Sequence, residues 1–236
     1  MTFDLAGQVH AEFRTLDDRW GTAAALSVRA KLALYQGKPD RARADAEYAD
    51  TLFRELGDSW GELQTTVTLG DLSEFTGDYY AAGHPRREGL RLAEQLKMWN
   101  EASKMLAQLG RTALLTGDLD RAESFHGRAK DLAAAHFYQR GEEFAEVVLT
   151  LVARRQGRLN DAETHLRAWL DWCRRWEGDL GVAFVLAELG FIAEQRGDAD
   201  AALTLYQEGL DYARRTGDRR ARTRLRRPRR RPRPHR

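Results

Sequence analysis

The sequence is poor in cysteine and proline, and it contains no long apolar run. Its single cysteine, Cys173, excludes an internal disulfide framework and a multi-cysteine metal site. Only Pro39 and Pro85 occur before residue 218, so little of the chain is interrupted by proline. No stretch approaches the roughly 18 apolar residues of a membrane span, and the N-terminus lacks a basic-then-apolar signal pattern. We therefore expect a cytoplasmic protein without membrane contact.

Motifs of common catalytic and metal sites are also missing. No two of the six histidines stand four residues apart, and no His-Glu-x-x-His occurs. There is no phosphate-binding loop, no Gly-x-Gly-x-x-Gly after a strand and no Gly-x-Ser-x-Gly elbow. The carboxylate pairs at residues 17–18 and 142–143 begin predicted helices, where capping and dipole roles explain them. We predict no catalytic residue, no metal, no cofactor and no enzymatic activity.

Positive charge is confined to one end of the chain. The formal net charge is only +2, from 38 Lys and Arg against 36 Asp and Glu. Residues 218–236 hold eleven arginines and one acid, which gives them a net charge of +10 and leaves −8 on residues 1–217. Three prolines and the lack of apolar periodicity predict a disordered Arg/Pro-rich tail over 218–236.

Two interpretations of this tail stay open. Arginines over 219–236 would neutralise nucleic-acid phosphates and give an affinity that depends strongly on salt. Alternatively, the tail is not a native ending, because Arg, Pro and His are what GC-rich DNA encodes when it is read out of frame. We favour the second interpretation, since the repeat pattern described next breaks abruptly at residue 219.

Glycine recurs at a constant interval of 40 residues. An alanine follows each of these glycines by five positions, and a small residue or threonine precedes each by seven. The three sets are Gly37, Gly77, Gly117, Gly157 and Gly197; Ala42, Ala82, Ala122, Ala162 and Ala202; and Ala30, Gly70, Gly110, Thr150 and Gly190. Halfway between them lies a second set of boundaries, with Asp-x-Trp-Gly at residues 18–21 and 58–61. Such self-similarity is typical of repeat architectures.

The segments between these boundaries have helical periodicity. Apolar residues recur three and four positions apart, and no segment alternates with period two. Glycine ends a helix in a left-handed conformation, and the aspartate that follows several of these glycines caps the next helix. Pro85, about two turns into its segment, predicts a kink or a late start. We predict an all-α, right-handed α-solenoid over residues 1–217, with a partial helix at 1–16 and antiparallel hairpins at 19–56, 59–96, 99–136, 139–176 and 179–216.

The repeat resembles the tetratricopeptide (TPR) family. That family's pattern is Leu-Gly, a Gly-Asp turn, alanine, an aromatic and a small residue. The best matches are Leu109-Gly110, Gly117-Asp118, Ala122, Phe125 and Ala129, and Leu189-Gly190, Gly197-Asp198, Ala202, Tyr206 and Gly209. The period departs from the family's 34 residues. Trp169 also departs, because it stands where other repeats have Ala49, Gly89, Ala129 and Gly209.

The longer period and the Trp-Gly boundaries look like TPR-like arrays that follow the ATPase module of LuxR-family and SARP-family bacterial regulators and related signalling ATPases. Arginine outnumbers lysine 33 to 5, which fits a GC-rich, actinobacterial genome. The resemblance implies a non-catalytic regulatory or sensor region of a transcriptional regulator or signalling ATPase. Because both ends lack a capping repeat, we expect a piece of a longer array, with self-association through uncapped ends as a further possibility.

The resemblance also implies a protein or peptide ligand in a concave groove lined by the first helix of each hairpin. Mapping the family's groove positions onto this chain selects Lys31, Gln64, Asp71, Glu74, Lys104, Arg111, Phe144, Arg154, Phe184, Phe191 and Glu194. Trp169, Trp172 and Trp176 form a separate stripe around Cys173. We favour helix packing over partner binding for this stripe, and a small buried hydrophobe over a reactive thiol for Cys173.

DNA binding tests the nucleic-acid interpretation of the tail. If residues 219–236 are a nucleic-acid arm, the chain ending at residue 236 will bind duplex DNA more tightly than the chain ending at residue 217 in a fluorescence-anisotropy titration, and its affinity will fall steeply as the salt concentration rises. Equally weak binding of the two chains would contradict this interpretation.

Overall fold

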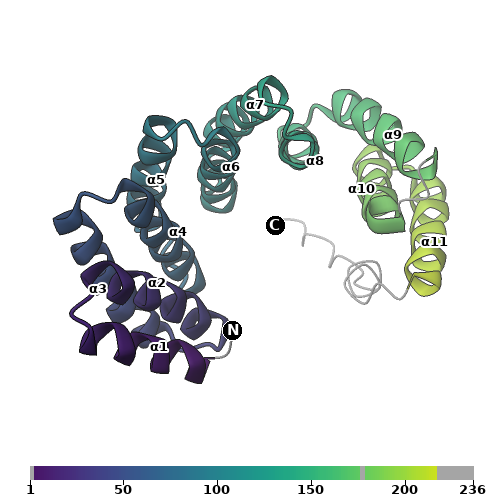
Figure 1. The fold of residues 1–236 in the computed structure, drawn as a ribbon. Coiled ribbons are helices and arrows are strands. Elements are labelled where there is room, and N and C mark those ends of the chain that lie inside the picture. Colours follow the sequence, from purple (N-terminus) through teal and green to yellow (C-terminus); the bar gives the residue numbers. More distant parts are fainter. Residues whose placement is uncertain (1–2, 176–178, 217–236) are drawn as a thin grey trace, which may run out of the picture. The chain divides into compact units, whose positions relative to one another are not determined.

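The computed structural model describes residues 3–175 and 179–216, and every element within these ranges is a helix. The helices are drawn in Figure 1. They are α1 (Phe3–Thr15), α2 (Arg19–Tyr35), α3 (Pro39–Leu56), α4 (Ser59–Phe75), α5 (Gly83–Gln95), α6 (Trp99–Thr116), α7 (Leu119–Ala135), α8 (Gln139–Arg155), α9 (Leu159–Arg175), α10 (Asp179–Arg196) and α11 (Ala199–Arg215). The tail predicted to be disordered, over 218–236, lies outside the described residues.

The chain divides into two compact units, residues 1–149 and 150–236. In the first unit each helix from α1 to α6 packs against the next one in the chain, and α2 also contacts α4. In the second unit α10 packs against both α9 and α11. Figure 1 shows α4 and α6 on one side of the first unit, with α5 and α7 on the other. The even-numbered helices are therefore the first helices of successive hairpins.

The turn inside each hairpin has a glycine in the left-handed conformation. Gly37, Gly77, Gly117, Gly157 and Gly197 have φ values of +70°, +81°, +85°, +82° and +83°. Residues with a Cβ rarely adopt this backbone, which explains why glycine is used at these turns. The next aspartate then caps the following helix, as where Asp118 Oδ1 accepts from Arg121 N at 3.1 Å and Asp198 Oδ1 accepts from Ala201 N at 3.0 Å.

Pro85 gives one of the two outcomes that its position predicts, a late helix start. Residues 79–82 form turns, and α5 begins only at Gly83. Pro85 therefore lies in the first turn of α5, where its missing N–H breaks no helical hydrogen bond.

The Asp-x-Trp-Gly motif connects successive hairpins. Asp58 caps α4 by accepting from the backbone N–H of Gly61 at 3.1 Å, and its second oxygen accepts from Trp20 Nε1 at 2.7 Å. Gly61 is required for close packing, because a Cβ there would lie 2.1 Å from the ring of Phe53. Trp20 belongs to the same motif one repeat earlier, so a hydrogen bond joins the two copies of the motif.

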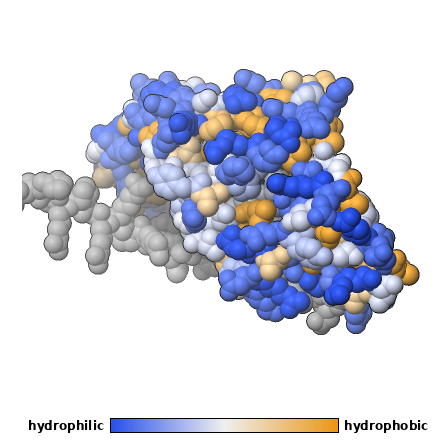
Figure 2. All heavy atoms as spheres, turned by 90° about the vertical axis from the view of Figure 1, so that its left-hand side faces the viewer, coloured by the Kyte–Doolittle hydropathy of each residue, from blue (hydrophilic) through white to orange (hydrophobic). Residues whose placement is uncertain are grey.

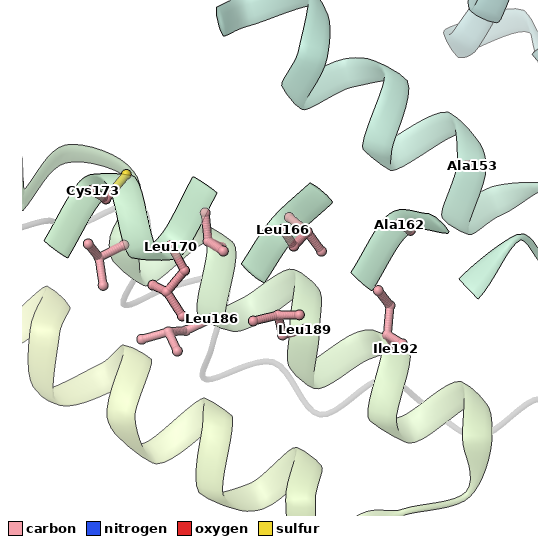
Figure 3. Close-up of a cluster of buried hydrophobic side chains, with 10 residues drawn as sticks. Ala153, Ala162, Leu166, Leu170, Cys173, Leu186, Leu189 and Ile192 are labelled. Atoms are coloured by element: carbon pink, nitrogen blue, oxygen red, sulfur yellow. The ribbon is translucent and has the colours of Figure 1, made fainter. Parts of the chain in front are cut away.

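The second unit is held by a cluster of apolar side chains between α9 and α10. Figure 3 shows Leu166 and Leu170 of α9 beside Leu186, Leu189 and Ile192 of α10. All five are buried, and burial of apolar surface is the main source of stability in such an interface.

Cys173 belongs to the same cluster and is only 1% exposed, which confirms its prediction as a buried hydrophobe. Trp169 packs against Phe184 of α10, with ring centroids 6.3 Å apart, as the packing interpretation requires. The Trp172 side chain and Trp176 lie outside the described residues.

The surface is mainly hydrophilic where it can be seen. Figure 2 views the side of the molecule nearest to α1–α5, where apolar residues form separate spots among hydrophilic ones. None of the helices in the described part of the chain is both long and apolar enough to cross a membrane.

Ala122 offers a test of the hairpin packing, because it is completely buried. We expect Ala122→Arg to lower the free energy of unfolding by about 1–3 kcal/mol or more, since a large cation must enter a close helix contact. Urea denaturation followed by circular dichroism measures this change. Ser124→Arg, at an exposed position of the same helix, is the control, and an Ala122→Arg variant as stable as this control would contradict the packing described here.

Candidate functional site

Seven of the residues selected from the sequence lie on the first helices of the N-terminal unit. We call them the even-helix face, defined by Lys31, Gln64, Asp71, Glu74, Lys104, Arg111 and Phe144. Contacts connect them across neighbouring helices: Lys31 Nζ of α2 donates to Gln64 Oε1 of α4 at 3.0 Å, and Arg111 of α6 pairs with Glu74 of α4. Two pairs of these side chains are therefore in contact across neighbouring helices, one between α2 and α4 and one between α4 and α6.

A buried arginine from a second helix supports this surface. Arg86 of α5 is only 1% exposed, and it passes Gly70 of α4, where an added Cβ would lie 3.1 Å from Arg86 Cγ. Its Nη2 pairs with Glu74 and lies 3.9 Å from an oxygen of Asp71. A buried cation needs such partners, because an unpaired one would carry a large desolvation penalty.

The second guanidinium nitrogen of Arg86 binds α6. Arg86 Nη1 donates to the backbone carbonyl of Gln108 at 3.3 Å and to the hydroxyl of Thr112. Arg86 thus connects α4, α5 and α6 in one hydrogen-bonded network. Through its contact with Glu74, this network also includes Arg111 of the even-helix face.

Burial changes the ionisation of two groups on this face. Partial burial raises the pKa of Asp71 above its usual value, and the nearby Arg86 opposes this rise. Burial lowers the pKa of Lys31, and the negative charges of Asp71 and Glu101 oppose that change. Both shifts mean that the charged forms of Asp71 and Lys31 are disfavoured, as expected where solvent is partly excluded.

A hollow of about 370 Å³ lies at the end of the even-helix face. Its lining comes from α6, from α8 and from Tyr138, which directly precedes α8. The lining residues are Ser103, Lys104, Ala107, Gln108, Arg111, Tyr138, Arg140, Gly141 and Phe144. Two aromatic rings and three cations therefore surround a space large enough for side chains of a partner. Three of the residues selected from the sequence, Lys104, Arg111 and Phe144, line this hollow.

His126 occupies the position that the sequence pattern assigned to Phe125. A Cβ on Gly110 would lie 2.2 Å from His126 Nδ1, just as a Cβ on Gly190 would lie 2.3 Å from the ring of Tyr206. The residue that packs on the first-helix glycine is thus His126, one position beyond Phe125. His126 is completely buried, and its Nδ1 donates to the Ala122 carbonyl at 2.8 Å.

The selected residues of the second unit are mostly used in packing. Arg154 is 6% exposed and pairs with the fully buried Glu188 at 3.0 Å. Its guanidinium also lies 5.5 Å from the ring centroid of Phe191. Phe184 packs on Trp169, as described above, and Glu194 is exposed. Arg154, Phe184 and Phe191 therefore contribute to contacts within the second unit, which the groove mapping did not predict.

Two features of the site were missed by the sequence reasoning. Arg86 stands 40 residues before His126, so the repeat register could have identified it as a residue that packs on a first-helix glycine. Tyr35, Phe75 and Leu115 also recur at 40 residues and are all exposed, Tyr35 at 87%. Each follows a residue of the even-helix face by four positions, or one helical turn, and adds apolar surface beside the charges.

Candidate metal ligands do not gather in this structure. No group of three or more His, Cys, Asp or Glu residues within residues 3–175 and 179–216 has a geometry suited to a metal ion.

Comparison with known proteins agrees with this architecture. A tetratricopeptide repeat family model matches residues 148–215. No curated protein matches the sequence.

Solved structures resemble nearly the whole chain. A signal transduction ATPase with a tetratricopeptide repeat sensor, from Pyrococcus horikoshii, superposes with a TM-score of 0.82 at 12% identity, over 94% of this chain and 35% of that protein. BtubC from P. vanneervenii gives 0.76 at 15% identity, over 92% and 91% of the two chains. A Rap conjugation gene regulator of plasmid pLS20, solved with the Phr* peptide, gives 0.63 at 16% identity, over 91% and 59%. The fold is an all-α, TPR-like solenoid. At such low identities the likeness establishes the TPR-like fold alone.

The buried His126 makes a testable contribution to the pH dependence of stability. Burial lowers its pKa in the folded state below the usual 6.5, although the hydrogen bond to Ala122 opposes this shift. The unfolded chain therefore binds a proton more readily, and the free energy of unfolding should fall as the pH drops below about 6.5.

We expect His126→Phe to reduce this loss of stability between pH 7 and pH 5, since an aromatic ring is already accepted at the equivalent Tyr206. Denaturant titrations at several pH values measure the effect, and His84→Gln, at an exposed histidine, is the control. An unchanged pH dependence in His126→Phe would contradict a buried, neutral His126.

Proposed function

We propose that this chain is a non-catalytic scaffold that binds a protein or peptide across its even-helix face. The observation that carries this proposal is the hollow of about 370 Å³, which is lined by charged, polar and aromatic side chains and includes three residues of the even-helix face. Binding sites of this kind combine apolar contact area with a few fixed polar groups. Arg86, Glu74 and Arg111 hold each other in place, so part of the surface is ordered before a partner arrives.

Preorganisation of this kind favours ligand binding. Charged side chains fixed by mutual contacts lose less conformational entropy when a ligand binds. The same contacts occupy the groups that a proton-transfer reaction would need, since Glu74 is paired with both Arg86 and Arg111. A recognition surface is therefore the simplest use of this arrangement.

We further propose that the chain acts as the regulatory or sensor region of a bacterial transcription regulator or signalling ATPase. Two comparisons support this finer proposal. The ATPase from Pyrococcus horikoshii carries a tetratricopeptide repeat sensor, and the Rap regulator was solved with a peptide. The resemblance of the Trp-Gly boundaries to such regulators, noted in the sequence, points in the same direction.

Selection from a phage-displayed random peptide library tests the scaffold function. We expect the full chain to enrich peptides whose affinity falls about tenfold or more in the double variant Lys104→Gln/Arg111→Gln, because charge-assisted hydrogen bonds to the ligand are lost. Binding is measured by fluorescence anisotropy with the selected peptides made synthetically.

A matched pair of substitutions provides the control. Arg43→Gln/Arg128→Gln removes the same number of charges from exposed positions of α3 and α7 and should leave affinity unchanged. Thermal unfolding of both double variants checks that each is folded. Peptides that bind both double variants as tightly as the unmodified chain would show that the even-helix face is not the binding site, and a library that yields no binder would contradict the scaffold function.

A further inference from the structure

The hollow at the end of the even-helix face is lined by charges of one sign. Lys104 and Arg111 of α6 and Arg140 of α8 contribute three cations, while no carboxylate lines the hollow. Glu74 pairs with Arg111, and Glu101 with Lys104 at 2.7 Å, but both acids lie outside the lining. The cations of the hollow therefore outnumber the acids that pair with them.

Arg140 carries the excess positive charge. It is exposed and forms no ion pair with any residue that the structure describes. Its guanidinium is free to bind a carboxylate of a ligand through two parallel hydrogen bonds, a geometry that a single ammonium group does not provide. An anionic ligand is thus favoured by charge complementarity.

The wall of the hollow contains two aromatic rings. Phe144 is 51% exposed, and Tyr138 lies under Lys104, whose Nζ is 5.7 Å from the ring centroid. Gly141 provides the space for Tyr138, because a Cβ there would lie 2.3 Å from the tyrosine ring. These rings offer apolar surface for a second aromatic ring, which packs favourably in offset or edge-to-face contact.

The turn before α8 fixes the position of Tyr138. Phe137 has φ +56°, a left-handed conformation that is unfavourable for an aromatic residue, and the backbone N–H of Tyr138 donates to the Ala133 carbonyl at 2.8 Å. The equivalent turn residues of the earlier repeats, Asp17, Gly57 and Lys97, have positive φ values as well. Tyr138 is therefore positioned by a regular turn of the repeat.

We propose that the hollow binds a peptide segment in which an acidic side chain stands next to an aromatic one. The carboxylate pairs with Arg140 and Lys104, and the aromatic side chain packs on Phe144 and Tyr138. This inference rests on the proposed function, because it specifies the sequence that the scaffold recognises. The size of the hollow suits two neighbouring side chains rather than a folded surface.

Fluorescein-labelled peptide pools test this specificity with the full chain. Each pool has a fixed central pair flanked by mixtures of uncharged residues, and the pairs are Glu-Phe, Gln-Phe and Glu-Ala. We expect the Glu-Phe pool to bind about tenfold more tightly than either of the others in fluorescence anisotropy, with an affinity that falls as salt is added.

Substitutions in the hollow identify the residues responsible. We expect Arg140→Gln to lower the affinity for the Glu-Phe pool and to leave the affinity for the Gln-Phe pool unchanged, because one of the two cations that pair with the glutamate carboxylate is lost. Arg128→Gln, at an exposed position of α7, should change neither affinity. Thermal unfolding of both variants confirms that they are folded.

The possible failures are distinguishable. If the Gln-Phe pool binds as tightly as the Glu-Phe pool, or Arg140→Gln has no effect, the acidic–aromatic specificity is wrong. If library peptides without an acidic–aromatic pair bind through Lys104 and Arg111, the scaffold function stands and this inference fails. If neither the pools nor the library yields a binder, both proposals fail.

Discussion

The close contact between the two helices of a hairpin is the constraint on which the rest of this structure depends. In three hairpins a glycine on the first helix receives a large side chain from the second: Gly70 receives Arg86, Gly110 receives His126, and Gly190 receives Tyr206. A Cβ at Gly110 or Gly190 would lie within 2.3 Å of the partner side chain, so the helices could not approach as they do. The small residue therefore sets the distance between the helices, and the large residue fills the space that remains.

This constraint allows the hairpins to differ in chemistry while sharing a backbone. Tyr206 packs on Phe191 with centroids 5.6 Å apart, whereas the shorter His126 lies near Phe144 at 6.5 Å. Arg86 differs most, because its guanidinium extends beyond the contact and reaches Glu74 and Thr112. A position that serves packing in one hairpin thus organises a charged surface in another. The even-helix face owes its order to a residue on the opposite helix layer.

Much of the fold could be predicted because its signals are local. Left-handed turns select glycine at Gly37, Gly77 and their equivalents, and a proline-poor chain with helical periodicity allows little besides helices. Arg86 could not be predicted in the same way. Arginine is rarely buried unless it is paired, and its partners lie 12 and 26 residues away on two other helices.

The selected site residues divide by a similar rule. Lys104 and Arg111 could be placed on the surface of the first helices by repeat position alone, since exposed polar side chains need no knowledge of their neighbours. Arg154 and Phe184 could not, because their use depends on Glu188 and Trp169, which no local pattern connects to them. His126 could be predicted only from the 40-residue register, which places it at the position of Arg86 and Tyr206. The family pattern selected the aromatic residue next to it, Phe125.

The glycine contacts also determine which part of this protein can be exchanged with a relative. A first helix carrying Gly70 leaves a gap unless its partner helix supplies a residue as large as Arg86. In the first complete hairpin the equivalent positions hold Ala30 and Ala46, and both are completely buried. Recombination that separates the two helices of a hairpin would therefore create either a cavity or a clash, whereas exchange of an intact hairpin carries both halves of the contact together. The hairpin, rather than the single helix, is the unit in which new binding surfaces can be tried without loss of the fold.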